Sequence, residues 1–434
     1  MINTAEVMLW GTRVGILHHP AAVSHISFEY DKDFLRSGIN LSPLKMPLSD
    51  RIYSFPELVG GSFHGAPGLV ADSLPDKFGN SIIERWLSEQ GKSINEFGVI
   101  DRLCYTGKRG MGALEYVPSA GPVMNSEDPI VIQKMVDFAS EILSSRNKIN
   151  ILQDDANYGQ LLQLGTSAGG ARAKALIAWN EKTREIKSGQ IEAGDGFEYW
   201  LMKFDGVSKN GDHNLKDGVE YTIIEYAYYL MAIDSGIEMY ECRIYEDNGL
   251  HHFMTKRFDR MGNKKIHMQT LGALSHIDYN VPGLCSYEQA ARYMREIGIS
   301  QKEIEQFYRR MVFNVLLVNQ DDHVKNVSFL MDKQGRWRLA PAYDITFSYN
   351  LNNIWLKAHQ MLINGKSENI TYSDLIESAE KMGIRKTVAE RTITEILDIA
   401  KNCDKYFDKV GLKEMSTNKI QKVINNGLNS LGIK

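Results

Sequence analysis

Two oxygen-bearing side chains in the second half of the chain have the types and spacing that phosphoryl transfer requires. The stretch from Asn314 to Ile345 reads NVLLVNQDDHVKNVSFLMDKQGRWRLAPAYDI, and it places Asp321 five residues before Asn326. Phosphoryl transfer needs a carboxylate that accepts or orients the proton of the attacking hydroxyl, and oxygen ligands that hold Mg²⁺ against the phosphates. Asp321 is therefore the candidate general base, and Asn326 is a candidate metal ligand.

The segment after Asn326 predicts how a second metal ligand reaches the same place. The short runs FLM and WRL flank the turn at 332–335, DKQG, and predict a β-hairpin. A hairpin returns the chain to its starting point, so we expect Asp344 to lie beside Asn326 and to complete the metal site. The adjacent Asp322 competes for the role of base. Because Asp and Asn are also common in turns, these residues alone leave a purely structural reading open.

A second candidate is the glycine-rich stretch LGTSAGGARAKALIAWN, residues 164–180. Backbone N–H groups of such a loop can approach phosphates closely, and Arg172 and Lys174 add positive charge. It is not a Walker A loop, because no Gly-Lys-Ser/Thr follows the glycines. A plain glycine turn is the alternative.

A lysine in an apolar strand is the third candidate. The run YWLMKFDG places Lys203 there, and a buried ammonium requires an anionic partner. ATP phosphates and a helix carboxylate supply that partner in kinases, and Glu225 in the following helix is the candidate carboxylate. The alternative is an edge-strand lysine that points to water.

The elements that must position these residues change character along the chain. Alternation at Ile26, Phe28 and Tyr30 predicts an early strand, and a turn at 11–12 separates two others. The segment FHGAPGLVADSLPDKFGNSIIERWL then enters a helix, for which Asp72 or Ser73 is the expected cap. YTGKRGMGALEYVP predicts a glycine-broken loop and a short strand.

The later part of the chain predicts mostly helices. We expect helices over 130–143, 223–233 and 301–319, and another that begins at Thr371, with Asp374 three residues on. Strands dominate from about 161 to 260. The expected fold is α+β and two-lobed, kinase-like, with a β-rich N-terminal region and a mostly α-helical C-terminal lobe. The turn-rich segment 118–129 is the candidate linker, and the expected domains are 1–120, 121–260 and 261–434.

Composition restricts the class of protein. The 434 residues are 43% hydrophobic and 24% charged, with a net charge of −4 and a pI near 6.3. This balance argues against holding nucleic acid through general electrostatics. The sequence predicts no membrane span and no secretory signal. Four widely spaced cysteines favour reduced thiols and a cytoplasmic location over a disulfide framework or a zinc site.

Taken together, these motifs resemble the HipA family of serine/threonine kinase toxins from bacterial type II toxin–antitoxin modules. FHGAPGLVADSLPDKFG and GKRGMGALEY are similar to the family's N-terminal coupling region, and TSAGGARAKA to its glycine-rich loop. TKRFDR resembles its hinge, and NQDDHVKN with LAPAYDI its catalytic and metal motifs. The motifs occur in family order over most of the chain.

The resemblance implies roles for individual residues. It makes Asp321 the base, Asn326 and Asp344 the Mg²⁺ ligands, and Ser167 an autophosphorylation site that switches the kinase off, with Thr166 as the alternative acceptor. The implied ATP-binding residues are Gly169, Gly170, Ala171, Arg172, Ala173, Lys174, Lys203, Glu225, Lys256, Arg257, Phe258, Asp259, His323, Lys325 and Tyr343. Among them, Lys256 to Phe258 are expected at the adenine and Asp259 near the ribose. Lys256 replaces an often acidic family residue, which leaves the backbone for the adenine contact.

The resemblance also implies partners. It predicts a protein substrate such as an aminoacyl-tRNA synthetase, and a small helix-turn-helix antitoxin of HipB type. Operator DNA is expected mainly through the antitoxin, and no membrane. Two other interpretations stay open: a small-molecule phosphotransferase, which shares the Asp-to-Asn spacing, and a catalytically silent binding module that acts with a DNA-binding antitoxin.

Overall fold

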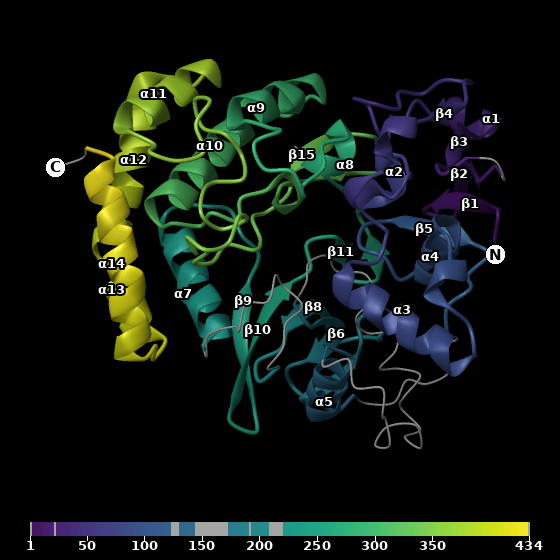
Figure 1. Ribbon diagram of the computed structural model, residues 1–434, viewed down its shortest axis with the longest axis horizontal. Coiled ribbons are helices and arrows are strands. Elements are labelled where there is room, and N and C mark those ends of the chain that lie inside the picture. The colour runs from purple at the N-terminus through teal and green to yellow at the C-terminus, as the bar shows by residue number, and fades with distance from the viewer. Residues whose placement is uncertain are drawn as a thin grey trace. The chain divides into compact units, whose positions relative to one another are not determined.

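The chain forms two compact units in the computed structural model (Figure 1). The structure describes residues 2–20, 23–122, 130–143, 172–190, 192–207 and 220–432. The first unit comprises Met1–Thr222 and Arg243–Gln269, and the second comprises Ile223–Cys242 and Thr270–Lys434. None of the helices in the described ranges is long and apolar enough to cross a membrane.

The first unit begins with an antiparallel five-stranded sheet of order β4-β3-β2-β1-β5. Its strands are β1 (Thr4–Leu9), β2 (Thr12–His18), β3 (Ser27–Tyr30), β4 (Tyr53–Ser54) and β5 (Leu114–Val117). The expected turn joins β1 to β2, with positive φ at Trp10 (49°) and Gly11 (84°). Glycine adopts this conformation without steric cost, which is why the turn falls there.

The chain between β3 and β5 forms several helices, most of them short. They are α1 (Lys32–Leu35), η1 (Pro56–Leu58), η2 (Gly61–Phe63), α2 (Gly68–Ala71), α3 (Lys77–Glu89), η3 (Ile94–Glu96) and α4 (Val99–Thr106). The predicted cap at Asp72 or Ser73 is wrong. Asp76 caps α3 instead, and its carboxylate accepts the Gly79 N–H at 2.7 Å. Leu74 and Pro75 separate the short α2 from α3, so the cap moves to the next aspartate.

A second antiparallel sheet of order β7-β6-β8-β10-β9 completes the first unit. Its strands are β6 (Lys174–Asn180), β7 (Glu185–Ser188), β8 (Glu198–Lys203), β9 (Cys242–Asp247) and β10 (Leu250–Lys256). The strands β11 (Arg260–Met261) and β12 (Lys264–Lys265) form a small hairpin after β10, and β13 is His267–Thr270. Helix α5 (Ile132–Leu143), as expected, packs beside this sheet.

One apolar cluster joins helix α3 to the second sheet. Phe78 and Ile82 of α3 pack with α5 and with Trp200 and Met202 of β8. Trp200 is fully buried. This shared core explains why the first unit extends from the first sheet through the second. The expected domain boundary at residue 120 stays a prediction.

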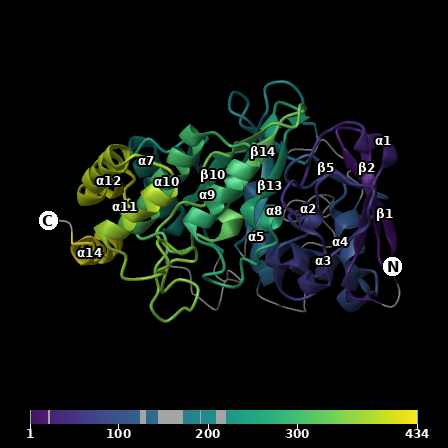
Figure 2. The ribbon, with the colours of Figure 1, turned by 90° about the horizontal axis from the view of Figure 1, so that it is seen from above.

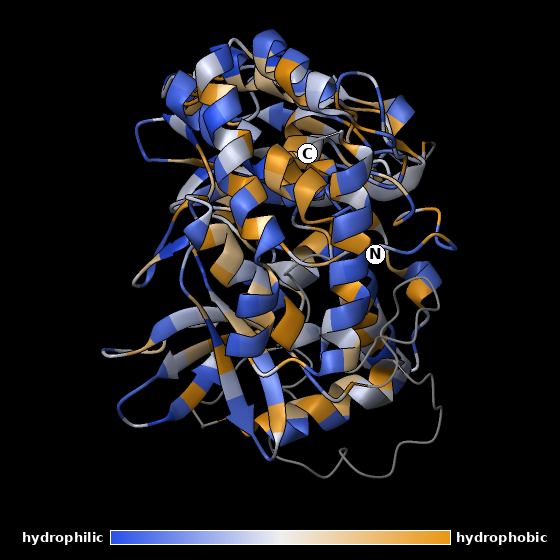
Figure 3. Cartoon of the chain, turned by 90° about the vertical axis from the view of Figure 1, so that its left-hand side faces the viewer, coloured by the Kyte–Doolittle hydropathy of each residue, from blue (hydrophilic) through white to orange (hydrophobic). Residues whose placement is uncertain are grey.

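The second unit is mostly helical, as the sequence predicted for the C-terminal part of the chain. Its helices are α7 (Tyr221–Asp234), α8 (Leu271–Ser275), α9 (Tyr287–Glu296), α10 (Gln301–Leu316), α11 (Tyr372–Lys381), α12 (Lys386–Lys401), α13 (Asp404–Lys409) and α14 (Glu414–Ser430), with the first turn of α7 assigned to the first unit. Figures 1 and 2 both show α11, α12 and α14 side by side. In Figure 3 these helices alternate hydrophilic and hydrophobic segments, as amphipathic helices do.

Two local features of the second unit, the end of α10 and a β-hairpin, determine where the site lies. Helix α10 ends at Leu316, three residues before the expected end, because Val318 adopts a left-handed φ of 56°. The Val318 carbonyl then accepts the Ser348 N–H at 3.1 Å. The predicted hairpin is confirmed as β14 (Ser328–Met331) and β15 (Trp337–Leu339), and Thr371 with Asp374 forms the predicted capping box.

Candidate functional site

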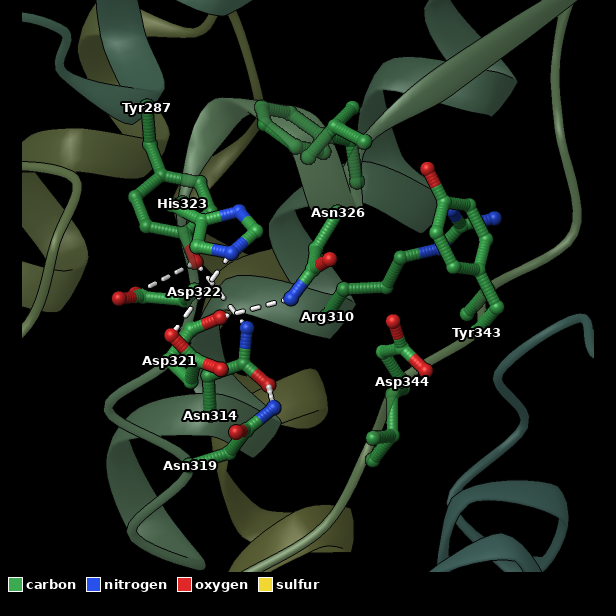
Figure 4. Close-up of a pocket in the computed structure, with 14 residues that line it drawn as sticks. Tyr287, Arg310, Asn314, Asn319, Asp321, Asp322, His323, Asn326, Tyr343 and Asp344 are labelled. Carbon is green, nitrogen blue, oxygen red and sulfur yellow. Dashed lines mark hydrogen bonds and ion pairs between the residues drawn. The ribbon is translucent and has the colours of Figure 1, made fainter. Parts of the chain in front are cut away.

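Asp321, Asn326 and Asp344 line a single pocket of the second unit (Figure 4). Asp321 lies in the segment after α10, Asn326 ends the 3₁₀ turn η4 (Val324–Asn326), and Asp344 follows β15. The hairpin therefore returns Asp344 to the neighbourhood of Asn326, as expected from the sequence. Their chemical roles stay predictions.

The Asn326 amide is oriented by the backbone of Asp321. Its Nδ2 donates to the Asp321 carbonyl at 2.8 Å, and its own backbone N–H donates to the His323 carbonyl at 2.9 Å. Because the amide nitrogen is used in this way, the side-chain oxygen turns toward the pocket, as Figure 4 shows. An amide oxygen in this place is a ligand type that Mg²⁺ accepts.

Asp344 occupies a strained backbone position. Its φ is 52°, in the left-handed region that most side chains avoid and that Asp and Asn tolerate best. A carboxylate and an amide oxygen on one wall fit a hard cation that also binds phosphate oxygens. The described residues contain no group of three or more His, Cys, Asp or Glu side chains that could hold a metal ion.

The two adjacent aspartates have different environments. The Asp321 side chain is 40% exposed, and its Oδ1 lies 3.8 Å from His323 Nε2. Asp322 is buried and accepts hydrogen bonds from the Tyr287 hydroxyl at 2.8 Å and the Gln360 N–H at 2.7 Å. His359 Nδ1 also contacts its Oδ2 at 2.9 Å. Asp322, the competitor for the base role, is therefore committed to the protein interior.

Three residues expected at the nucleotide, His323, Lys325 and Tyr343, take part in a small network of side-chain contacts. The Tyr343 hydroxyl donates to the Lys325 carbonyl at 2.7 Å and contacts the Ser328 hydroxyl. The Lys325 ammonium lies 4.7 Å from the centre of the Tyr279 ring, and the His323 ring lies 5.4 Å from that ring. His323 and Tyr343 line the pocket, so these sequence-selected residues come together, and their contact with a nucleotide stays a prediction.

Sequence reasoning missed Arg310, Asn314 and Tyr287, which also line the pocket. Arg310 is buried and donates to the Ala340 carbonyl at 2.7 Å, and burial lowers the pKa of its guanidinium to about 10. The sequence signal that could have identified Arg310 and Asn314 was their position in the helix. Phe307, Arg310 and Asn314 share one face of α10 at helical spacing, so two polar residues interrupt an apolar stripe.

The predicted phosphate-binding lysines lie on adjacent strands of the first unit. Lys174 of β6 pairs in register with Lys203 of β8, and both residues are buried. Directly opposite residues of an antiparallel pair project on the same face. Lys174 Nζ lies 4.0 Å from Asp76 Oδ2, and Lys203 Nζ lies 5.8 Å from the centre of the Phe253 ring. The alternative of a water-facing Lys203 is wrong.

The remaining glycine-rich-loop residues divide between described and undescribed positions. Arg172 lies 3.4 Å over the Tyr221 ring, and Ala173 is buried. Thr166, Ser167, Gly169, Gly170 and Ala171 lie outside the described residues. Glu225 belongs to the second unit and Lys203 to the first, so their pairing stays a prediction.

The hinge residues are engaged within the first unit. Arg257 donates two hydrogen bonds to the fully buried Asp259, at 2.9 and 2.8 Å, and Arg260 adds a third at 2.7 Å. The Gly112 N–H also donates to Asp259 at 2.8 Å. Burial opposes ionisation, but the two guanidinium groups outweigh it and hold the pKa of Asp259 well below its usual range.

This geometry bears on the expected nucleotide contacts. The Lys256 ammonium pairs with Glu198, and Phe258 is buried. Asp259 directs its oxygens to the protein interior, so its ribose contact and the adenine contacts of 256–258 stay predictions. The structure adds an unexpected link, because the loop of the coupling region at Gly112 helps to hold Asp259.

The fold and the site define a kinase-like α+β protein with a candidate phosphoryl-transfer pocket. A family model described as the HipA N-terminal domain matches residues 5–117, and one described as the HipA-like C-terminal domain matches residues 166–403. The second match covers more than half of the chain. The chain therefore belongs to the HipA family.

Individual proteins of other organisms are similar to this chain. Over 242 residues the sequence is 27% identical to a Haemophilus influenzae protein described as "Putative kinase", covering 48% of this chain and 70% of that protein. The fold is similar to HipA of Shewanella oneidensis MR-1, solved with HipB and its operator DNA. The TM-score is 0.65 at 16% identity, over 98% of this chain and 96% of that one. The Helicobacter pylori proinflammatory kinase CtkA matches at a TM-score of 0.40 and 13% identity, over 61% of this chain and 90% of that one.

Proposed function

We propose that this protein is an ATP- and Mg²⁺-dependent serine/threonine protein kinase that acts as the toxin of a toxin–antitoxin module. The observation that carries the proposal is the pocket in which Asp321, Asn326 and Asp344 meet. Membership of the HipA family and the likeness to a relative described as a kinase support it.

In the proposed reaction, Asp321 accepts the proton of a serine or threonine hydroxyl. The hydroxyl oxygen forms a bond to the γ-phosphorus of ATP, the bond from that phosphorus to the β–γ bridging oxygen breaks, and ADP leaves with the electron pair. The exposure of Asp321 supports this role, since a base for a protein hydroxyl must be reached from outside. The committed hydrogen bonds of Asp322 make it the poorer choice.

Asn326 and Asp344 are the proposed Mg²⁺ ligands. When bound, Mg²⁺ neutralises charge on the β- and γ-phosphates during transfer. Lys174 and Lys203 are the proposed phosphate contacts from the first unit, because they are buried directly opposite each other and project on the same face of the sheet. Their assignment, with that of Glu225 and the hinge, rests on the family resemblance and on this burial.

The biological role is proposed from the relatives. The Shewanella oneidensis HipA was solved with HipB and operator DNA, which supports a small DNA-binding antitoxin as partner here. The net charge of −4 agrees with leaving operator contacts mainly to that partner. We propose an aminoacyl-tRNA synthetase as substrate, and Ser167 as an inhibitory autophosphorylation site whose added charge repels ATP phosphates.

The test is incubation of the purified chain with γ-labelled ATP and Mg²⁺, with and without a panel of synthetases, followed by phosphopeptide mapping. We expect label on serine or threonine, loss of label with EDTA, and a fall of about 10²- to 10⁴-fold in Asp321→Asn, the usual contribution of a general base. Undiminished labelling by Asp321→Asn removes Asp321 from the base role. Label on small hydroxylated compounds in place of protein favours the small-molecule phosphotransferase.

A further inference from the structure

A buried hydrogen-bond network lies directly behind the catalytic loop. Asp322 is at its centre, with its Oδ1 held by the Gln360 N–H and its Oδ2 held by the Tyr287 hydroxyl and His359 Nδ1. An ionised carboxylate only accepts, so Nδ1 of His359 carries the hydrogen in this arrangement. The whole set is buried.

The network extends into α10. The Tyr287 hydroxyl accepts a hydrogen bond from Asn314 Nδ2 at 3.1 Å, and Asn314 Oδ1 accepts one from Asn319 Nδ2 at 3.0 Å. Figure 4 shows Asn319, Asn314 and Tyr287 leading to Asp322. These contacts connect the end of a rigid helix with α9 and with the chain near 360. Both oxygens of the buried Asp322 carboxylate have partners, and a buried polar group held in this way favours one geometry over its alternatives.

The loop that follows Asp344 is held at both ends by the catalytic loop. At one end, the Gln320 N–H donates to the Ser348 carbonyl at 3.0 Å, and the Ser348 N–H donates to the Val318 carbonyl at 3.1 Å. At the other end, His359 and Gln360 bind Asp322. Residues 349–358 therefore leave and rejoin the protein interior at points bonded to residues 318–322.

We propose that Asp322 is a positioning residue for the phosphoryl-transfer site, and this rests on the proposed function. The peptide between Asp321 and Asp322 is anchored on two sides, by Asn326 at the Asp321 carbonyl and by the buried network at the Asp322 side chain. These two anchors fix the backbone of Asp321, whose carboxylate is exposed. Asp322 thus orients the base without contacting substrate, and it couples that orientation to the chain near 360.

The decisive variant is Asp322→Ala in the full chain, compared with the conservative Asp322→Asn. Asparagine keeps an acceptor for Gln360 and can donate its NH₂ to Tyr287 and to the other tautomer of His359. In Asp322→Ala we expect transfer of label from γ-labelled ATP to fall about 10- to 100-fold, as for a small misplacement of a reacting group. The Kd for Mg-ATP should change less than about threefold, because no network member is a proposed ligand. Asp322→Asn should recover most of the rate.

Hydrogen exchange tests the geometry without relying on activity. Backbone amides of 320, 326 and 360 should exchange roughly tenfold faster in Asp322→Ala, while amides in the centre of α12 stay unchanged. Asp332→Asn, which alters an exposed carboxylate paired with Arg336 in the hairpin turn, is the matched control and should change neither readout. If Asp322→Ala does not fold, Tyr287→Phe removes the hydrogen bonds to Asp322 and from Asn314 and keeps the ring contact with Phe307.

Three results overturn the positioning role. They are unchanged exchange in Asp322→Ala, failure of Asp322→Asn to recover the rate, and a loss of Mg-ATP affinity that equals the loss of rate. A wild-type chain with no transfer and no Mg-ATP binding overturns the proposed function. In that case faster exchange in Asp322→Ala leaves only a structural role, and the catalytic assignment of Asp322 falls with the function.

Discussion

Two buried aspartates in different units of this protein are held in contrasting ways. Asp259 of the first unit lies between the guanidinium groups of Arg257 and Arg260 and also accepts the Gly112 N–H. Asp322 of the second unit accepts from a tyrosine hydroxyl, a backbone N–H and a histidine ring. The first carboxylate is compensated by full charges and the second by hydrogen-bond donors.

The difference indicates what each region is built for. Two arginines around one carboxylate tolerate little change, because removal of the negative charge leaves buried positive charge uncompensated. Hydrogen-bond donors can rotate or change tautomer, so the network around Asp322 adjusts to substitutions that preserve its shape. We therefore expect the predicted hinge, residues 255–260, to respond to mutation mainly in stability, and the candidate site at 321–326 mainly in the rate of the proposed reaction.

The largest expected effect on stability is that of Asp259→Asn. It should lower the free energy of unfolding by about 3 to 5 kcal/mol, since it leaves Arg257 and Arg260 buried without their counter-charge. Chemical denaturation measures the change. A loss under about 1 kcal/mol, the usual size for a surface substitution, contradicts the proposed contrast between the two aspartates.

The same cluster predicts a pH dependence. The folded pKa of Asp259 is depressed, so its contribution is fully present above the ordinary carboxyl pKa of about 4. It is lost as the pH falls below that value toward the folded pKa. Wild type should therefore lose more stability than Asp259→Asn between pH 5 and the acid transition, each measured by denaturation across that range.

Asp344 tests the candidate site of the second unit. Asp344→Asn should keep the left-handed backbone, because Asn tolerates it nearly as well as Asp. It should raise the Mg²⁺ concentration needed for half-maximal labelling at least about tenfold, the size of effect that supporting partners of a metal already show. Asp344→Ala should add a stability loss of about 1 to 2 kcal/mol from the backbone. An unchanged Mg²⁺ requirement in Asp344→Asn argues against the metal role.

Asp76 tests the coupling region within the first unit. Asp76→Asn keeps the cap of α3, since Asn caps as well as Asp, but removes the charge beside Lys174. We expect a loss of about 1 to 3 kcal/mol in unfolding free energy, the range for a buried polar group that loses a partner, because the counter-charge 4.0 Å from the Lys174 ammonium is removed. Asp76→Ala should lose roughly 1 kcal/mol more, because it also removes the cap. Equal losses in the two variants mean that the cap contributes nothing.

The smallest expected effect is that of Glu198→Gln, which separates the partly exposed Lys256 from its carboxylate. The change in unfolding free energy should lie below about 1 kcal/mol, as for exposed ion pairs. It serves as the control for Asp259→Asn, because it removes a partly exposed carboxylate charge where Asp259→Asn removes a buried one. A loss as large as that of Asp259→Asn shows that burial does not set the size of these effects.

Much of this protein follows from local pattern. Alternation and turn residues predicted β1 to β3, and helical spacing predicted α5, α10 and the α11 cap at Thr371. The D-x-x-x-x-N spacing and the hairpin turn correctly predicted that Asp321, Asn326 and Asp344 lie together, because a short hairpin constrains both of its ends. These features depend on residues close in sequence, which is why local sequence patterns are enough to predict them.

Tertiary structure decided the rest. The choice between Asp321 and Asp322 depends on Tyr287 and on the chain near 360, which are distant in sequence and reach only Asp322. The interior orientation of Asp259 depends on Gly112, and the partner of Lys174 is Asp76. Adjacent aspartates look alike in a sequence, and burial, which arises on folding, separates the exposed candidate base from a structural carboxylate.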